Sequence, residues 1–146
     1  MALDSGFAEF LEDEFGRMLP EPQERTREAF ADLGFGERNA EFVEFWSTFS
    51  EEMYGTVGYT SDVSLDVLNF DGSRTAALRQ HDGLAENYYE FFNPELDDFL
   101  FYDRATDEVL LVEAGGYGDF LEDRSAAQTW PTFVAFIKEF LEFDEE

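Results

Sequence analysis

The stretch DFLFYDRATDEVLLVE, residues 98–113, decides the fold class of this chain. It contains two apolar runs, residues 99–102 and 109–112, on either side of the polar residues 104–107. Two short apolar segments joined by a short polar loop are typical of the antiparallel strands of a β-hairpin. This hairpin is the strongest β signal in the chain and predicts an antiparallel sheet.

Apolar residues at helical spacing lie on both sides of the hairpin. They predict helices over about residues 5–18, 22–33 and 39–53, and a closing helix capped by Thr129 that runs to about residue 141. Helices, then strands, then a helix, without alternating βαβ units, predict one α+β domain over residues 1–146. The N-terminal helices and the C-terminal helix would pack on its largely antiparallel sheet.

The segments between these elements are less decisive. Alternating apolar residues from Val57 to Val67 predict strands before a turn at residues 71–72, although Val63, Val67 and Phe70 would also suit a short helix. Residues 73–82 show no clear period. The aromatic residues of the stretch 88–92 predict another strand, and the glycines of residues 115–118 predict a loop.

The net charge of -26 narrows the classes of partner. Because 44% of the residues are apolar and 18% aromatic, the chain has enough material for a packed core, and we expect a folded domain. Its field repels nucleic acid and anionic membranes and attracts basic protein surfaces. The eight arginines and one lysine also suit a high-GC genome or adaptation to high salt, but 18 phenylalanines argue against salt adaptation.

Two features bear on the compartment. No apolar run approaches the roughly 18 residues of a membrane helix, and the N-terminal residues MALDSGFAEF lack the basic and apolar regions of a signal peptide. The chain contains no cysteine, which suits a reducing compartment. The sequence therefore predicts a cytoplasmic protein without membrane contact.

Catalytic chemistry is poorly represented. The single histidine, His81, lies in the polar residues 80–83, where we expect an exposed loop, and no serine lies in a nucleophile elbow. Residues 103–108 lack the ligand spacing of a calcium loop, and residues 115–118 lack the basic or hydroxyl neighbours of a phosphate-binding loop. The sequence predicts a protein that is not an enzyme and that binds no cofactor and no metal.

Acidic groups are the candidate binding residues. They occur on the third predicted helix, before the hairpin and after the glycines: Glu44, Glu51 and Glu52; Asp97 and Asp98; Glu122 and Asp123. Each group alone is more often a solvated surface, and the functional interpretation depends on their summed field. Four tyrosines are candidate anchors for a partner, although most are expected in the core: Tyr88, Tyr89, Tyr102 and Tyr117.

The order of elements resembles the SUKH superfamily. The resemblance is carried by acidic N-terminal helices, the aromatic residues FVEFW at 42–46, the hairpin at 99–112 and the closing residues WPTFVAFIKEF at 130–140. It implies an α+β fold and, in bacteria, an immunity protein that neutralises a toxin, often a nuclease. The contact surface of that family is variable, so the resemblance assigns no binding residue here.

The predicted function is therefore a protein-binding inhibitor, an immunity protein that neutralises a basic, nuclease-type toxin through an acidic surface. A nuclease presents a basic groove to hold phosphates, and an acidic domain is its natural counterpart. Two alternatives stay open. One is a nucleic-acid mimic that blocks a DNA-binding enzyme, and the other is a salt-adapted domain whose acidity has no binding role.

Overall fold

The computed structural model describes residues 3, 5–17, 19–49, 53–56, 58–92 and 98–143. Its α-helices are α1 (Ser5–Phe15), α2 (Pro20–Asp32), α3 (Ala40–Thr48), α4 (Val63–Leu68), α5 (Arg74–Asp82), α6 (Tyr117–Asp123) and α7 (Phe133–Phe140). Its 3-10 helices are η1 (Glu37–Asn39), η2 (Phe70–Gly72) and η3 (Ala114–Gly116). Its strands are β1 (Tyr54–Gly55), β2 (Gly58–Tyr59), β3 (Tyr88–Glu90), β4 (Phe99–Asp103), β5 (Val109–Val112) and β6 (Gln128–Trp130).

The predicted hairpin is confirmed as β4 and β5, the centre of a four-stranded antiparallel sheet in the order β3-β4-β5-β6. Phe101 pairs with Leu110, and the backbone N–H of Asp103 donates to the carbonyl of Glu108 at 2.9 Å. Asp107 in the connecting turn has a positive φ of 69°. The short hairpin β1-β2 is a separate two-stranded sheet, and an isolated antiparallel bridge joins Thr60, which follows β2, to Phe92, which lies after β3. The α+β fold class is thus confirmed.

Several local predictions differ from the structure. Residues 63–68 form helix α4 rather than a strand, and its inward-facing side chains Val63 and Val67 are buried. Residues 74–82 form helix α5, where the hydroxyl of Ser73 accepts a hydrogen bond from the N–H of Ala76 at 3.2 Å. The predicted glycine loop is η3 followed directly by α6. Such short helices depend on tertiary packing more than on intrinsic propensity, so periodicity detects them poorly.

The helix boundaries also shift. Helix α3 ends at Thr48, before the predicted end near residue 53, and α7 is capped by Thr132 instead of Thr129, because residues 128–130 form β6. The hydroxyl of Thr132 accepts from the N–H of Ala135 at 3.1 Å. The predicted left-handed glycine at the end of α2 is confirmed, since Gly34 has φ of 91°.

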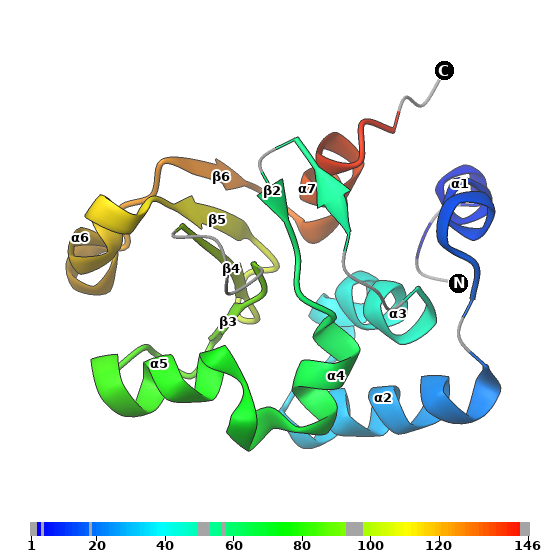
Figure 1. Ribbon diagram of the computed structural model, residues 1–146, viewed down its shortest axis with the longest axis horizontal. Helices are drawn as coiled ribbons and strands as arrows, with labels where there is room; N and C mark the ends of the chain where they lie inside the picture. Colours follow the sequence, from blue (N-terminus) through cyan, green and yellow to red (C-terminus); the bar gives the residue numbers. More distant parts are fainter. Residues whose placement is uncertain are drawn as a thin grey trace.

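The sheet is buried on both faces by different helices. Figure 1 shows α5 and α6 on one side of the sheet and α3 and α7 on the other. Along β4, Leu100 and Tyr102 belong to the large core cluster with α3 and α7, which we call the aromatic face. Phe101 points the other way and packs with Leu110, Val112 and α6, and we call this side the α6 face. The two-residue period of a strand separates the two sets.

The aromatic face is built of ring contacts. Phe42 on α3 stacks on Tyr102 with ring centroids 3.8 Å apart, and Phe133 on α7 meets Phe42 edge-on at 4.9 Å. Phe136 meets Trp130 of β6 edge-on at 4.9 Å. Offset and edge-to-face ring pairs of this kind each add about 0.5–1.5 kcal/mol to the burial of their area. The predicted packing of the C-terminal helix on the sheet is therefore observed.

A buried polar network fixes the turn of the β4-β5 hairpin. The hydroxyl of Tyr102 donates to the carboxylate of Asp107 at 2.5 Å, and the side-chain amide of Asn39 donates to that hydroxyl at 2.7 Å. The same amide donates to the carbonyl of Arg104 at 2.9 Å. Asn39 lies just before α3, but its side-chain oxygen accepts from the N–H of Gly36 at 3.2 Å and does not cap α3.

Among the described residues, no helix combines the length and the apolar character needed to cross a membrane.

Candidate acidic binding surface

Five carboxylates lie on neighbouring segments of the fold around α6. They come from the start of β4, the end of β5 and the helix that follows, and we call them the acidic surface: Asp98, Glu113, Asp119, Glu122 and Asp123. The carboxylate of Asp98 accepts from the N–H of Ala114 in η3 at 3.1 Å, which joins the two segments. A groove of about 320 Å³ runs through this surface and is lined in part by Glu113 and Asp119.

The local sequence explains why these carboxylates face outward. The N–H of Gly116 donates to the carbonyl of Glu113 at 2.8 Å, a tight turn that starts α6 directly after β5. Phe120 is the buried residue of this seven-residue helix, and its ring stacks on Phe101 of β4 at 4.6 Å. The acidic residues of α6 remain exposed.

Arg124, the residue that directly follows α6, is already engaged. Its guanidinium binds the carboxylates of Asp103 and Glu108, both at 2.8 Å, and the hydroxyl of Tyr88 at 2.8 Å. Burial alone would raise the pKa of Asp103, but hydrogen bonds from Asn87 and Arg124 lower it below its ordinary value. Arg124 therefore pairs with carboxylates of the sheet, and among the described residues no ion pair joins a basic side chain to any of the five carboxylates of the acidic surface.

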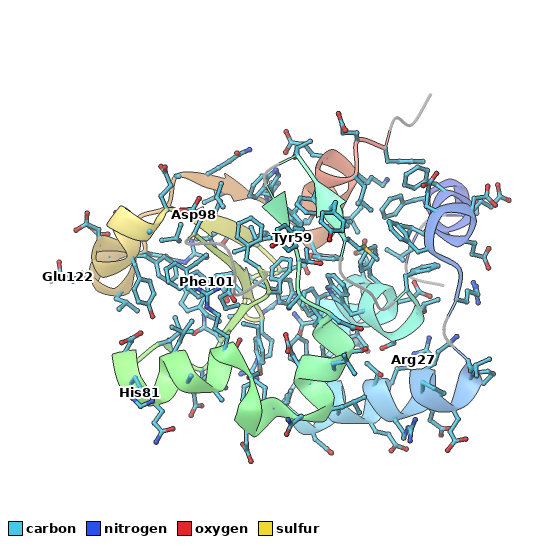
Figure 2. All side chains as sticks on the ribbon, viewed as in Figure 1. Arg27, Tyr59, His81, Asp98, Phe101 and Glu122 are labelled. Atoms are coloured by element: carbon cyan, nitrogen blue, oxygen red, sulfur yellow. The ribbon has the colours of Figure 1, made fainter. Side chains whose placement is uncertain are left out.

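Most other basic side chains are engaged within the fold as well. Arg38 donates to the carbonyl of Ala105, Arg79 to the carbonyl of Tyr88 at 3.2 Å, and Arg104 to the hydroxyl of Tyr89 at 3.3 Å. These contacts consume cationic groups without neutralising any carboxylate. The exposed arginines Arg25 and Arg27 lie on α2, and Figure 2 shows Arg27 and Glu122 toward opposite ends of the long axis.

The structure divides the predicted binding residues. Asp98 is half-buried at the start of β4 and bonds to the N–H of Ala114, and Glu122 and Asp123 are exposed on α6, so these three belong to the acidic surface as defined above. Glu44 lies elsewhere, on α3, and its carboxylate accepts from the backbone N–H of Leu3 at 2.7 Å. Glu51, Glu52 and Asp97 lie outside the described residues. Glu113 and Asp119 were missed, because their approach depends on the turn through η3, although the glycines at 115, 116 and 118 marked that a turn was there.

The four predicted tyrosine anchors are largely internal, as expected. Tyr89 and Tyr102 are buried in the core, whereas Tyr88 and Tyr117 are half-buried. Tyr117 stacks on Phe99 at 4.4 Å and donates its hydroxyl proton to Asp82 at 3.0 Å, which ties α6 to the end of α5. These tyrosines therefore pack within the fold and expose little side-chain area for contact with a partner.

A buried ion pair lies at the β3 edge of the α6 face. One carboxylate oxygen of Glu90, Oε2, accepts from the backbone N–H groups of Phe92 at 3.0 Å and Leu100 at 3.1 Å. The other, Oε1, lies 3.4 Å from Nη1 of Arg74, and among the described residues neither of these two atoms makes a hydrogen bond. Glu90 thereby links Phe92, just after β3, to Leu100 in β4.

The environment of Glu90 favours its neutral form. Burial raises its pKa to about 8, against the attraction of Arg74 and the two backbone donors. Burial also raises the pKa of Asp66, and both carboxyl groups line a cavity of about 20 Å³, enough room for one water molecule. Glu90 was absent from the predicted site because the sequence does not distinguish it from the exposed glutamates.

The described residues offer little catalytic chemistry. His81 is exposed as predicted, but it lies in the last turn of α5 instead of a loop, and Figure 2 shows it pointing away from the sheet. In the described ranges, no three His, Cys, Asp or Glu side chains are placed to share a metal ion. What the acidic surface can do chemically is bind cationic groups.

Comparison of the chain with protein-family models, with curated proteins and with solved structures found no match. The function is therefore argued from the acidic surface itself.

Proposed function

We propose that this chain is an inhibitor of the immunity type, which binds and neutralises a basic protein of the nuclease-toxin class. The observation that carries the proposal is the uncompensated acidic surface around α6. The five carboxylates lie on the segments around α6 without an ion pair among the described residues, and Arg124, which directly follows α6, is held by Asp103 and Glu108.

The physical argument is electrostatic complementarity. A nuclease holds phosphates with lysine and arginine, so its active groove is basic. A carboxylate surface of the opposite sign speeds the encounter and orients the two proteins, and this gain falls as salt screens the field. The groove between Glu113 and Asp119 would receive a cationic side chain of the partner.

Two further observations agree with this proposal. The resemblance of the sequence to the SUKH superfamily at residues 42–46, 99–112 and 130–140 implies an immunity protein of this kind. A cysteine-free composition suits the cytoplasm, where a protein that protects its own cell from a nuclease would act. A cytoplasmic location is thus part of the proposal.

Charge reversal tests the surface. A panel of basic nucleases and unrelated DNA-binding proteins is first screened for binding at physiological ionic strength. For each binder, the association rate is measured with Asp119→Lys plus Glu122→Lys on α6, and with Glu9→Lys plus Asp13→Lys on α1 as the control of equal charge change. All four carboxylates are exposed.

We expect one nuclease to bind, and the α6 variant to associate about tenfold more slowly than the α1 variant, with a flatter salt dependence. Equal slowing by both variants would show that only net charge matters, and the acidic surface would lose its role. Binding to several unrelated DNA-binding proteins, in competition with DNA, would favour a nucleic-acid mimic. Binding to no basic protein would leave salt adaptation as the explanation of the charge.

A further inference from the structure

Two tyrosines form an exposed stacked pair on the β1-β2 hairpin. Tyr54 pairs with Tyr59 across the two strands, and their rings stack with centroids 5.0 Å apart and planes inclined by 23°. Tyr54 nevertheless keeps 72% of its surface accessible, while Tyr59 is half-buried. We call this pair the tyrosine platform. It was not among the four tyrosines that the sequence suggested as anchors.

The platform stands on a rigid base. Met53 and Thr60, the residues that flank the hairpin, are fully buried, and the N–H of Thr60 donates to the carbonyl of Met53 at 2.9 Å. At the tip, the N–H of Thr56 donates to the carbonyl of Phe140 at 3.0 Å. A Cβ on Gly55 would lie 2.4 Å from that same carbonyl oxygen, so only glycine allows this close approach to α7.

Cross-strand packing alone does not explain the platform. Strands of two residues are too short to be stable on their own, and this hairpin is held by Met53, Thr60 and Phe140 beneath it. An exposed aromatic ring on a fixed backbone loses little conformational entropy when a partner binds, which is why tyrosine is common at binding hot spots.

The charge around the platform selects the partner. Glu139 and Glu142 flank Phe140 in the chain and are exposed. The one lysine of α7, Lys138, lies over the rings of Phe7 at 5.5 Å and Phe143 at 5.8 Å, on the α1 side of the helix. The carboxylate of Glu139 accepts a hydrogen bond from Nε1 of Trp130, and the platform belongs to a chain with a net charge of -26, so a cationic partner is favoured.

We propose that the tyrosine platform is an anchor for an arginine side chain of the basic partner. The proposal rests on the proposed function and deepens it by naming the contact group. A guanidinium is planar, stacks on aromatic rings and is less strongly hydrated than an ammonium, so a stacked tyrosine pair in an acidic setting prefers arginine to lysine. The acidic surface at α6 supplies attraction for both cations, and the platform supplies the discrimination.

Two peptides of equal charge serve as probes, one of eight arginines and one of eight lysines. Their dissociation constants are measured by calorimetry at physiological ionic strength for the native chain and four variants. Tyr54→Phe keeps the ring face, Tyr54→Leu keeps an apolar side chain without a ring, and Leu19→Ala is the control, since Leu19 is 73% exposed at the start of α2. Asp119→Lys with Glu122→Lys alters the acidic surface alone.

We expect the native chain and Leu19→Ala to bind the arginine peptide roughly two- to fivefold more tightly than the lysine peptide. Tyr54→Phe should keep this ratio, and Tyr54→Leu should reduce it to about one while the lysine affinity stays unchanged. The α6 variant should weaken both peptides equally and keep the ratio.

If Tyr54→Leu still prefers the arginine peptide, the proposal that the platform anchors arginine is wrong, whereas the proposed role of the acidic surface is unaffected. Binding of neither peptide by the native chain would overturn both proposals. Self-association of the native chain that Tyr54→Leu abolishes, measured by sedimentation, would assign the platform to a second copy of this chain and equally overturn the arginine anchor.

Discussion

The two faces of the sheet are built from different materials. The aromatic face is closed by rings of α3 and α7, such as Phe42 on Tyr102 at 3.8 Å, and is continuous with the main core. The α6 face has a smaller apolar cluster around Phe101 and Phe120 and carries the Glu90–Arg74 pair at its edge. Helices on the first face bury most of their apolar side chains, whereas α6 buries Phe120 alone.

This difference separates the side of the domain that is closed by ring packing from the side that carries exposed charge. Ring packing involves no charge, so the stability that the aromatic rings supply does not depend directly on pH. The α6 face has fewer packed apolar side chains and more ionisable groups. Its contribution to stability therefore changes with both pH and salt. The fold tolerates the repulsion between carboxylates on the acidic surface because the packing of the aromatic face offsets its free-energy cost.

The strongest test of the comparison removes a ring from each face. Phe136→Ala should lower the free energy of unfolding by about 3–5 kcal/mol, because the ring is fully buried between Trp130 and Phe140, at 4.9 and 5.1 Å. Phe120→Ala should cost less, about 2–3 kcal/mol, since the short helix α6 can move into the space. Both are measured by chemical denaturation, and equal losses would contradict the asymmetry.

The second test concerns pH. The pKa of Glu90 is about 8 in the fold and near 4.5 in the unfolded chain, so the folded state holds a proton that the unfolded state releases. The stability linked to Glu90 is therefore complete below about pH 4.5 and is lost as pH rises through 8, about 3 kcal/mol of it between pH 5 and 8.

Glu90→Gln should flatten this pH dependence, because the amide keeps the shape of the carboxyl group and does not titrate. Denaturation midpoints across pH 5–8 measure the slope, and Glu122→Gln, which removes an exposed carboxylate, is the control. A slope unchanged in Glu90→Gln would show that another group titrates.

The third test removes the arginine that neutralises the sheet beneath α6. Arg124→Ala should destabilise the fold by about 1–3 kcal/mol, because Asp103 is buried and loses its ionic partner. Glu108→Gln breaks the half-exposed arm of the same network and should cost less than about 1 kcal/mol.

The pKa of Asp103 distinguishes the two variants. Hydrogen bonds lower this pKa in the native fold, so the stability that it contributes is present above its ordinary value and is lost as pH falls through the lowered one. Arg124→Ala should raise the pH at which the acid loss begins, as followed by acid titration of the fluorescence of the tryptophans. If both variants lost tryptophan fluorescence at the same acid pH, Arg124 would not be the group that lowers the pKa of Asp103.

The smallest expected effect is the change in stability when an exposed carboxylate is neutralised at either end of the long axis of the molecule. Glu122→Gln should stabilise the fold by a few tenths of a kcal/mol at low salt, because it relieves repulsion on the acidic surface. Glu28→Gln on α2 should be neutral or slightly destabilising, since Arg25 lies three residues before it on the helix. Melting temperatures at low and moderate salt would reveal the difference, and the same stabilisation at both sites would argue for a uniform field.

Much of the fold was predictable where the sequence carries a long, regular signal. The hairpin at residues 98–113, the end of α2 at Gly34 and the apolar stripe of α7 were all predicted and are confirmed. Helix α5 buries Thr75 and otherwise has little inward-facing apolar surface, so no stripe marked it. Helix α6 likewise buries only Phe120, so its sequence shows no apolar stripe either.

The candidate site was predicted in part for a related reason. A run of acidic residues shows that Asp98, Glu122 and Asp123 carry charge, but not which carboxylates share a surface. Glu113 and Asp119 join them through the turn of η3, and Glu44 leaves the set because it binds the backbone of Leu3. Both outcomes depend on distances between residues that are remote in the chain.

By itself the sequence determined the fold class, the strongest strands and helices and the sign of the field, because these follow from local period and from composition. Only the tertiary structure decided which charges stay uncompensated, that Glu90 is buried beside Arg74 and that Tyr54 is exposed. Burial and pairing are properties of three-dimensional neighbours, and identical residue types acquire opposite roles according to the elements packed against them.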